Sequence, residues 1–161
     1  MKLVERHLIK PSNNLYYVCD DLTFKSKNLY NAGLYQIRQS IFERNKSDRE
    51  NKKPVLSWAQ LVSEFRKQKQ TDMFSLPSKV STNIIRMLGG NISSYYQLLK
   101  GYNDKSNKKI TNEPKIPGYL HKTEGRYVVE FTNQTFAKKR GKNNELILCP
   151  KDLNISIPTR V

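Results

Sequence analysis

The period of the apolar residues changes near residue 118, and this change constrains the fold more than any other feature of the sequence. Before it, apolar side chains recur at intervals of three and four residues, which is typical of helices that bury one face. After it, apolar and polar side chains alternate, which is typical of strands. This order predicts an α+β fold in which a helical block precedes most of the strands.

A long helix is predicted over residues 15–44. Its buried stripe is expected to consist of Val18, Leu22, Leu29, Ala32, Gly33, Ile37 and Ile41. Gly33 within the stripe predicts close packing against another helix, since glycine costs about 1 kcal/mol relative to alanine in a helix interior. Polar residues off the stripe, among them Lys27, are expected to face solvent or a phosphate backbone. The charged residues 45–55 then predict a linker.

Two further helices are predicted. The Ser-Trp-Ala-Gln sequence that starts at Ser57 matches a capping box, so a helix should begin there and fade near Lys69. Pro77 suits the first turn of a third helix, which should end near Gly101. The glycine pair at 89–90 can kink or interrupt that helix. The expected apolar stripes are Trp58, Leu61, Val62 and Phe65 in the second helix, and Val80, Ile84, Met87, Leu88, Asn91, Tyr95 and Leu98 or Leu99 in the third.

Four short strands are predicted around this block. One precedes Pro11, and the others cover residues 126–131, 145–148 and 154–158. Residues 136–145 (FAKKRGKNNE) are expected to form a basic turn between the first two of these later strands.

An extended basic loop is predicted at residues 103–118, which contain four lysines and two prolines. At the C-terminal end, the sequence stops at Val161, where the pattern of a further strand begins. We therefore expect a truncated domain.

The charge balance points to a polyanionic partner, because 29 Lys and Arg against 14 Asp and Glu give a net charge of +15. No apolar run approaches the roughly 18 residues of a membrane span, so no membrane partner is expected. Cys19 and Cys149 form no CxxC pair and are expected to be small buried hydrophobes in a reducing cytoplasm. The two histidines are not at metal-ligand spacing, and no cofactor is expected in this chain.

Five segments share their order and spacing with a known family. They are Lys25–Asn31 (KSKNLYN), Arg38–Gln39, Leu76–Ser81 (LPSKVS), Pro114–Lys122 (PKIPGYLHK) and Phe131–Gln134 (FTNQ). Through them essentially the whole chain resembles the N-terminal part of TnpB (OrfB) proteins, which insertion-sequence transposons encode and which are ancestors of type V CRISPR effectors. The glycine pair at 89–90 departs from the longer uninterrupted helix that is usual in the family.

This resemblance implies both a fold and a role. Family members are RNA-guided DNA endonucleases whose N-terminal half is a small split β-barrel, the wedge, with an inserted helical recognition domain. Residues 1–13 would be the first wedge strand, 14–103 the recognition domain, and 104–161 the basic loop with the remaining wedge strands. The implied partners are a guide RNA made from a transposon end and a target DNA that carries a short adjacent motif.

Cleavage in the family belongs to a RuvC-like domain with three metal-binding carboxylates and an inserted zinc ribbon. Two-metal cleavage needs several carboxylates in one site. The acidic residues of this chain are scattered, and the adjacent Asp20 and Asp21 would point to different faces of a helix. We therefore expect no enzymatic activity from this chain, with magnesium and zinc confined to a missing C-terminal nuclease part that would be a further partner.

Three sets of residues are candidates for nucleic-acid contact. The resemblance assigns reading of the target-adjacent DNA motif to the start of the third helix, where the spacing of Lys79, Asn83 and Arg86 puts them on one face. A second set on the long helix would bind RNA or DNA. The alternative for Arg38 and Gln39 is that they cap neighbouring elements, and the alternative for Tyr30 is a place in the core beside Leu29. A third, basic set interleaved with an aromatic suits RNA, because bases stack on rings while cations follow phosphates. The sets are Lys79, Ser81, Thr82, Asn83 and Arg86; Lys25, Asn28, Tyr30, Asn31, Arg38 and Gln39; and Lys115, Tyr119, Lys122, Arg126, Asn133, Gln134, Lys138, Lys139 and Arg140.

The alternative function is a helix-turn-helix-type DNA-binding transposase fragment or repressor that acts without RNA. The segment between the predicted second and third helices is longer than the usual turn of about three or four residues, which disfavours it. An enzyme that itself transposes or cuts DNA is disfavoured by the scattered carboxylates. The expected location is the bacterial cytoplasm, in association with the nucleoid.

Overall fold

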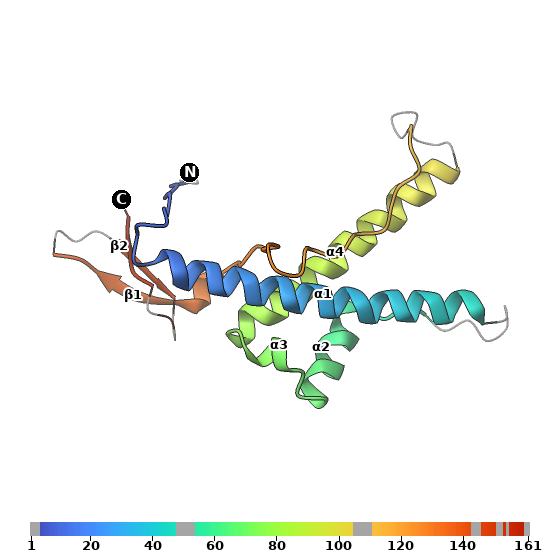
Figure 1. Cartoon of the computed structure of the whole chain (residues 1–161), viewed down its shortest axis with the longest axis horizontal. Coiled ribbons are helices and arrows are strands. Elements are labelled where there is room, and N and C mark those ends of the chain that lie inside the picture. The colour runs from blue at the N-terminus through green and yellow to red at the C-terminus, as the bar shows by residue number, and fades with distance from the viewer. Residues whose placement is uncertain are drawn as a thin grey trace.

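The computed structural model describes residues 4–47, 54–104, 111–142, 146–150, 153 and 155–159. Within these ranges the chain is an α+β protein with four α-helices and a small antiparallel sheet (Figure 1). The helices are α1 (Tyr16–Lys46), α2 (Trp58–Lys67), α3 (Thr71–Phe74) and α4 (Ser78–Asn103). A 3-10 turn, η2 (Asn133–Thr135), precedes the strands β1 (Phe136–Arg140), β2 (Leu146–Pro150) and β3 (Ile157–Pro158). Within the described residues no helix is both long and apolar enough to cross a membrane.

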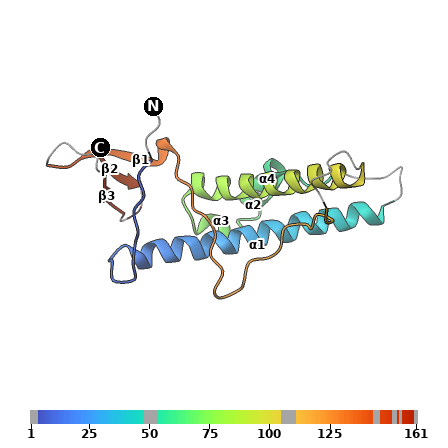
Figure 2. The same cartoon turned by 90° about the horizontal axis from the view of Figure 1, so that it is seen from above.

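The long helix α1 is the scaffold of the fold, and the prediction of a helix over residues 15–44 is confirmed. Helix α4 crosses it and runs in the same general direction, as the two views in Figures 1 and 2 show. A Cβ atom added to Gly33 would lie 2.9 Å from side-chain atoms of both Ile85 and Leu88 of α4. The predicted close helix packing at Gly33 is therefore confirmed.

Helix α2 begins at the predicted capping box. The Ser57 hydroxyl accepts a hydrogen bond from the Gln60 backbone N–H, and the Gln60 side chain accepts one from the Ser57 N–H. Leu61, Val62 and Phe65 are buried as predicted, whereas Trp58 stays partly exposed. The short helix α3 was not predicted, because a single turn is too short to show a period.

Helix α4 runs without interruption through the glycine pair, so the pair does not break the helix. Pro77 occupies the N-cap position, one residue before the first turn. The residues of α4 that are buried in the core are Val80, Ile84, Ile85, Leu88 and Ile92. Asn91, which was predicted in the stripe, is exposed and donates a long hydrogen bond (3.4 Å) to the Tyr127 hydroxyl.

Residues 115–131, which we call the strap, cover α1 in an irregular, extended conformation (Figure 2). The strand predicted over 126–131 is wrong, since no strand is assigned there. The alternation itself is present, because Tyr127 and Val129 are half-buried between exposed neighbours. The extended chain packs on a helix instead of a neighbouring strand. Its Tyr127 N–H donates to the Thr23 carbonyl, and the Ser26 hydroxyl donates to the Val128 carbonyl.

The sheet has the order β1-β2-β3 and is antiparallel and open. Strands β2 and β3 confirm two predicted strands, although Glu145 and Asn154 lie outside the described residues. Strand β1 corrects the predicted basic turn over 136–145, because all five residues of FAKKR pair with β2. The first predicted strand is also wrong, since residues 4–10 form no regular element.

Both cysteines are free and partly buried, so the prediction that they are buried is met only in part.

Candidate nucleic-acid interface

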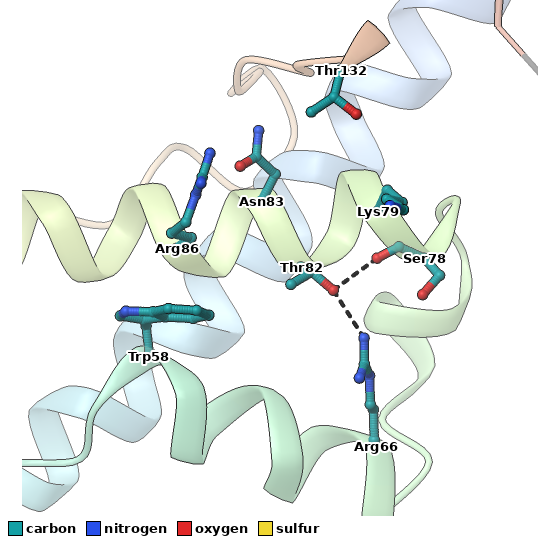
Figure 3. A pocket seen from close by; sticks show the side chains of 8 residues that line it. All are labelled: Trp58, Arg66, Ser78, Lys79, Thr82, Asn83, Arg86 and Thr132. Carbon is teal, nitrogen blue, oxygen red and sulfur yellow. Dashed lines mark hydrogen bonds between the residues drawn. The ribbon is translucent and has the colours of Figure 1, made fainter. Parts of the chain in front are cut away.

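A basic hollow of about 370 Å³ lies where α2 and η2 approach the first three turns of α4 (Figure 3). We call it the basic hollow. Its walls come from three parts of the chain that are distant in sequence. The lining residues are Trp58, Arg66, Ser78, Lys79, Thr82, Asn83, Arg86 and Thr132.

Hydrogen bonds hold one wall of the basic hollow in place. The Arg66 guanidinium donates to the Thr82 hydroxyl (3.0 Å), which in turn donates to the Ser78 carbonyl (2.8 Å). Figure 3 shows Arg66 reaching from α2 toward α4 along this chain of bonds. The guanidinium is thereby directed at the first turns of α4, where the helix dipole favours anions.

The opposite wall is linked to the segment that leads to the sheet. The Asn83 amide donates to the Glu130 carboxylate (2.6 Å), and the Lys79 ammonium donates to the Gln134 amide oxygen (2.5 Å). Lys79 was expected to read DNA and Gln134 to bind RNA, and the structure brings the two side chains together. The sequence could not show this contact, because 55 residues separate them.

The basic hollow carries positive charge that is not neutralised locally. Arg66, Lys79 and Arg86 all line it, and none of the salt bridges between described residues includes one of them. The nearby carboxylate of Glu130 is held by Asn83. Like charges around one hollow repel each other, so the site favours an anion.

Four of the five residues predicted to read DNA therefore line one hollow: Lys79, Thr82, Asn83 and Arg86. The fifth, Ser81, is wrong as a surface residue, because it is only 1% exposed and its hydroxyl donates to the Ser78 carbonyl. It lies on the α4 face that packs in the core, one residue from Val80. Asn83 is likewise buried, at 6% exposed, although it lines the hollow. Residue spacing had not separated these two residues from the exposed Lys79 and Arg86.

In the second predicted set, on α1, Asn31 and Arg38 bind the strap rather than an outside ligand. The Asn31 side chain donates to the Leu120 carbonyl and accepts from the Leu120 N–H, both at 2.9 Å. The Arg38 guanidinium donates to the Pro117 carbonyl (2.6 Å). Capping of a neighbouring element, which was the alternative for Arg38, describes its contact, and Asn31 holds the strap in the same way.

Two more residues of α1 are buried: Lys27 contrary to the prediction, and Tyr30 in agreement with its alternative place in the core. Lys27 is only 1% exposed, and its ammonium donates to the Lys122 carbonyl (2.5 Å). Burial, with the nearby charge of Arg126 as a lesser cause, lowers the pKa of Lys27 below its usual value. Tyr30 is 4% exposed and packs against the Tyr127 ring at 4.4 Å, so it is a core residue.

The remaining members of this set lie nearer the surface. Lys25 is half-buried and pairs with the Asp21 carboxylate four residues earlier (2.6 Å). Asn28 is half-buried and Gln39 is exposed. Asn28 and Gln39 stay available for nucleic-acid contact, whereas the Lys25 ammonium is paired with Asp21.

Arg126, from the third set, forms a bidentate pair with Asp20 of α1 at 2.7 and 2.8 Å. The hydrogen bond from Arg126 lowers the pKa of the Asp20 carboxyl, and the same bond raises the pKa of Arg126. Asp20 is thus the ion-pair partner of the strap. Arg126 is committed to that pair.

The other residues of the third set lie at the surface and are not gathered in one place. Tyr119 is 49% exposed, with the Arg38 guanidinium 4.8 Å from its ring centre. The side chain of Lys138 lies outside what the structure describes. The remaining residues, all exposed, are Lys115, Lys122, Asn133, Gln134, Lys139 and Arg140.

Arg66 and Trp58 were not predicted as functional residues. Trp58 was assigned to the core by its helical spacing, and Arg66 carried no signal in a sequence rich in cations. Their positions follow from the packing of α2 on α4. Among the described residues no group of three or more His, Cys, Asp and Glu side chains could hold a metal ion.

Comparison of the chain with protein-family models, with curated proteins and with solved structures finds no match. Function is therefore argued from the geometry and charge of the basic hollow.

Proposed function

We propose that this chain is a nucleic-acid-binding module and that the basic hollow is its main contact surface. The observation that carries the proposal is the convergence of Arg66, Lys79 and Arg86, none of them paired with a described carboxylate. A phosphate backbone relieves the repulsion between such cations and releases its own counterions. The net charge of +15 attracts a polyanion from a distance.

Within this class, we propose the TnpB-like role expected from the sequence. The four helices would be the recognition domain, and the open sheet would be part of a split wedge barrel in an RNA-guided, transposon-encoded endonuclease. The contact between Lys79 and Gln134 supports this role, because it joins the expected DNA-reading and RNA-binding sets. The chain would supply binding, and a RuvC-like part would supply cleavage.

The arrangement of the helices disfavours the helix-turn-helix alternative. Residues 68–77 separate α2 from α4 and include the additional helix α3. A helix-turn-helix joins its two helices by a turn of about three or four residues.

A salt titration tests the binding surface. Each phosphate contact adds about 0.9 to the slope of log K against log salt for duplex DNA and about 0.7 for a single strand. Arg86→Ala is expected to lower the slope by one such increment, measured by anisotropy of a labelled oligonucleotide. Lys67→Ala is the matched control, because Lys67 is exposed on α2 but does not line the hollow. Equal effects of both substitutions would contradict the proposed surface.

Purification without nuclease treatment tests the guide-RNA role. A discrete co-purifying RNA that maps to a transposon end would support it. Random RNA that high salt removes would contradict it. Sequence-specific binding to duplex DNA in RNase-treated samples would instead support a repressor.

A further inference from the structure

Trp58 is the only tryptophan of the chain, and it lines the basic hollow. It is the first residue of α2 and stays 40% exposed, while Leu61 and Phe65 of the same helix are fully buried. Figure 3 shows the indole ring between α2 and α4, on the same side of α4 as Arg66. The hollow thus combines an aromatic surface with cations.

Gly89 sets the position of this indole. A Cβ atom added to Gly89 would lie 2.8 Å from the Trp58 Cβ and 3.1 Å from its Cδ1. The Trp58 Cβ is bonded to the backbone, so rotation of the side chain cannot relieve that contact. A Cβ atom added to the neighbouring Gly90 would meet nothing within 4 Å. Only the first glycine of the pair is therefore needed for α2 to bring its tryptophan against α4.

The cations lie at different distances along α4 from this indole. Arg86 lies one turn before Gly89, and Lys79 lies in the first turn of α4. Arg66, two turns after Trp58 in α2, is directed toward α4 by Thr82. Along α4 all three cations therefore lie on the N-terminal side of the indole, so the phosphate chain of a nucleotide on Trp58 would reach them by running in that direction.

We propose, resting on the function proposed above, that the hollow binds an unpaired nucleotide whose base stacks on Trp58 and whose phosphates contact Arg66 and Arg86. Stacking needs a free base face, which a single strand offers and a base inside a duplex does not. The volume of 370 Å³ is within the range of about 300–1,000 Å³ of small-ligand sites. Single-stranded DNA and RNA share this chemistry.

Tryptophan fluorescence tests the proposal, because Trp58 is the only source of that signal. The full chain is titrated with a 12-nucleotide single-stranded DNA, the RNA of the same sequence and the corresponding DNA duplex. We expect saturable quenching by the single strands and little by the duplex. The stronger of the two single-strand signals identifies the nucleic acid preferred by the site.

Two pairs of variants give the energetic test. Trp58→Ala is expected to weaken single-strand binding by roughly five- to hundredfold, the loss of one stacked base, whereas Trp58→Phe retains most of the affinity. Gly89→Ala should displace the indole, shift its emission and weaken single-strand binding, whereas Gly90→Ala should change neither. Circular dichroism shows that each variant is folded. If Trp58→Ala does not fold, two other measurements test the stacking proposal. They are the quenching of Trp58 fluorescence in the unmodified chain and the single-strand affinity of Trp58→Phe.

The failures of the two proposals are distinguishable. Quenching by the duplex equal to that by single strands would overturn the stacking proposal, as would single-strand affinity unchanged in Trp58→Ala. Salt-dependent binding in the anisotropy assay would then leave the proposed function standing. No binding to any of the three probes at low salt would overturn both.

Discussion

Asn31 provides the sharpest test of how the strap is held. Its side chain makes two 2.9 Å hydrogen bonds to the backbone of Leu120, one as donor and one as acceptor. Asn31→Ala removes both and leaves the Leu120 N–H and C=O without these partners in a partly buried place. A net hydrogen bond contributes about 0.5–1.5 kcal/mol, and an unsatisfied buried group costs about 1–3 kcal/mol. The better helix propensity of alanine offsets about 0.5 kcal/mol.

We therefore expect Asn31→Ala to lower the free energy of unfolding by about 2 kcal/mol. For a chain of 161 residues this corresponds to a fall in Tm of roughly 4–8 °C. Urea unfolding followed by circular dichroism, with an unchanged m-value, measures the loss.

Asn28→Ala is the matched control. Asn28 lies three residues earlier in the same helix and is half-buried like Asn31, but its side chain makes no hydrogen bond to another described residue. Its substitution should leave stability within about 0.5 kcal/mol of the original. An Asn31→Ala protein as stable as the original, with weakened nucleic-acid binding, would refute the structural role and restore the role first predicted from the sequence.

Three other outcomes follow from the packing and the charges. Gly33→Ala should destabilise the protein by about 1 kcal/mol, since the new methyl group overpacks the α1–α4 contact. Gly90→Ala, where the space is open, should stabilise the protein by about 0.5–1 kcal/mol. Thermal melts of the two variants measure both effects, and a change of stability in the same direction for both would contradict this reasoning. The lowered pKa of Asp20 means that its pair with Arg126 stabilises the fold fully above pH 3.8 and less as the pH falls through the folded-state pKa. The stability difference between the original chain and Asp20→Asn should therefore shrink below pH 3.8, and a constant difference would contradict the ion pair.

Local patterns in the sequence predicted most of the helical part of the fold. The stripe from Val18 to Ile41 predicted α1, the capping box predicted the start of α2, and Gly33 predicted a close helix contact. Each of these signals depends on residues within a few positions of one another, or on a steric property of one residue. Such signals are readable without knowledge of the tertiary structure.

The strap shows where local patterns become ambiguous. Alternation over residues 126–131 describes an extended chain with one covered face, and both a strand and a segment packed on a helix meet that description. The sequence could not show which element this segment packs on, because its contact residue Ser26 lies about 100 residues away in the chain. In β1, two consecutive lysines concealed a strand that pairs along its whole length with β2.

For the polar residues of α1 and α4, too, the sequence determined one part of the answer and the tertiary structure the other. By itself, the sequence determined that they lie off the main apolar stripe and that the chain carries a large positive charge. Only the tertiary structure decided that Lys27 and Asn31 face carbonyl groups of the strap, while Arg86 faces the basic hollow. The physical reason is that a polar side chain takes whichever partner folding brings within hydrogen-bond distance. For these residues that partner comes from a distant segment of the chain.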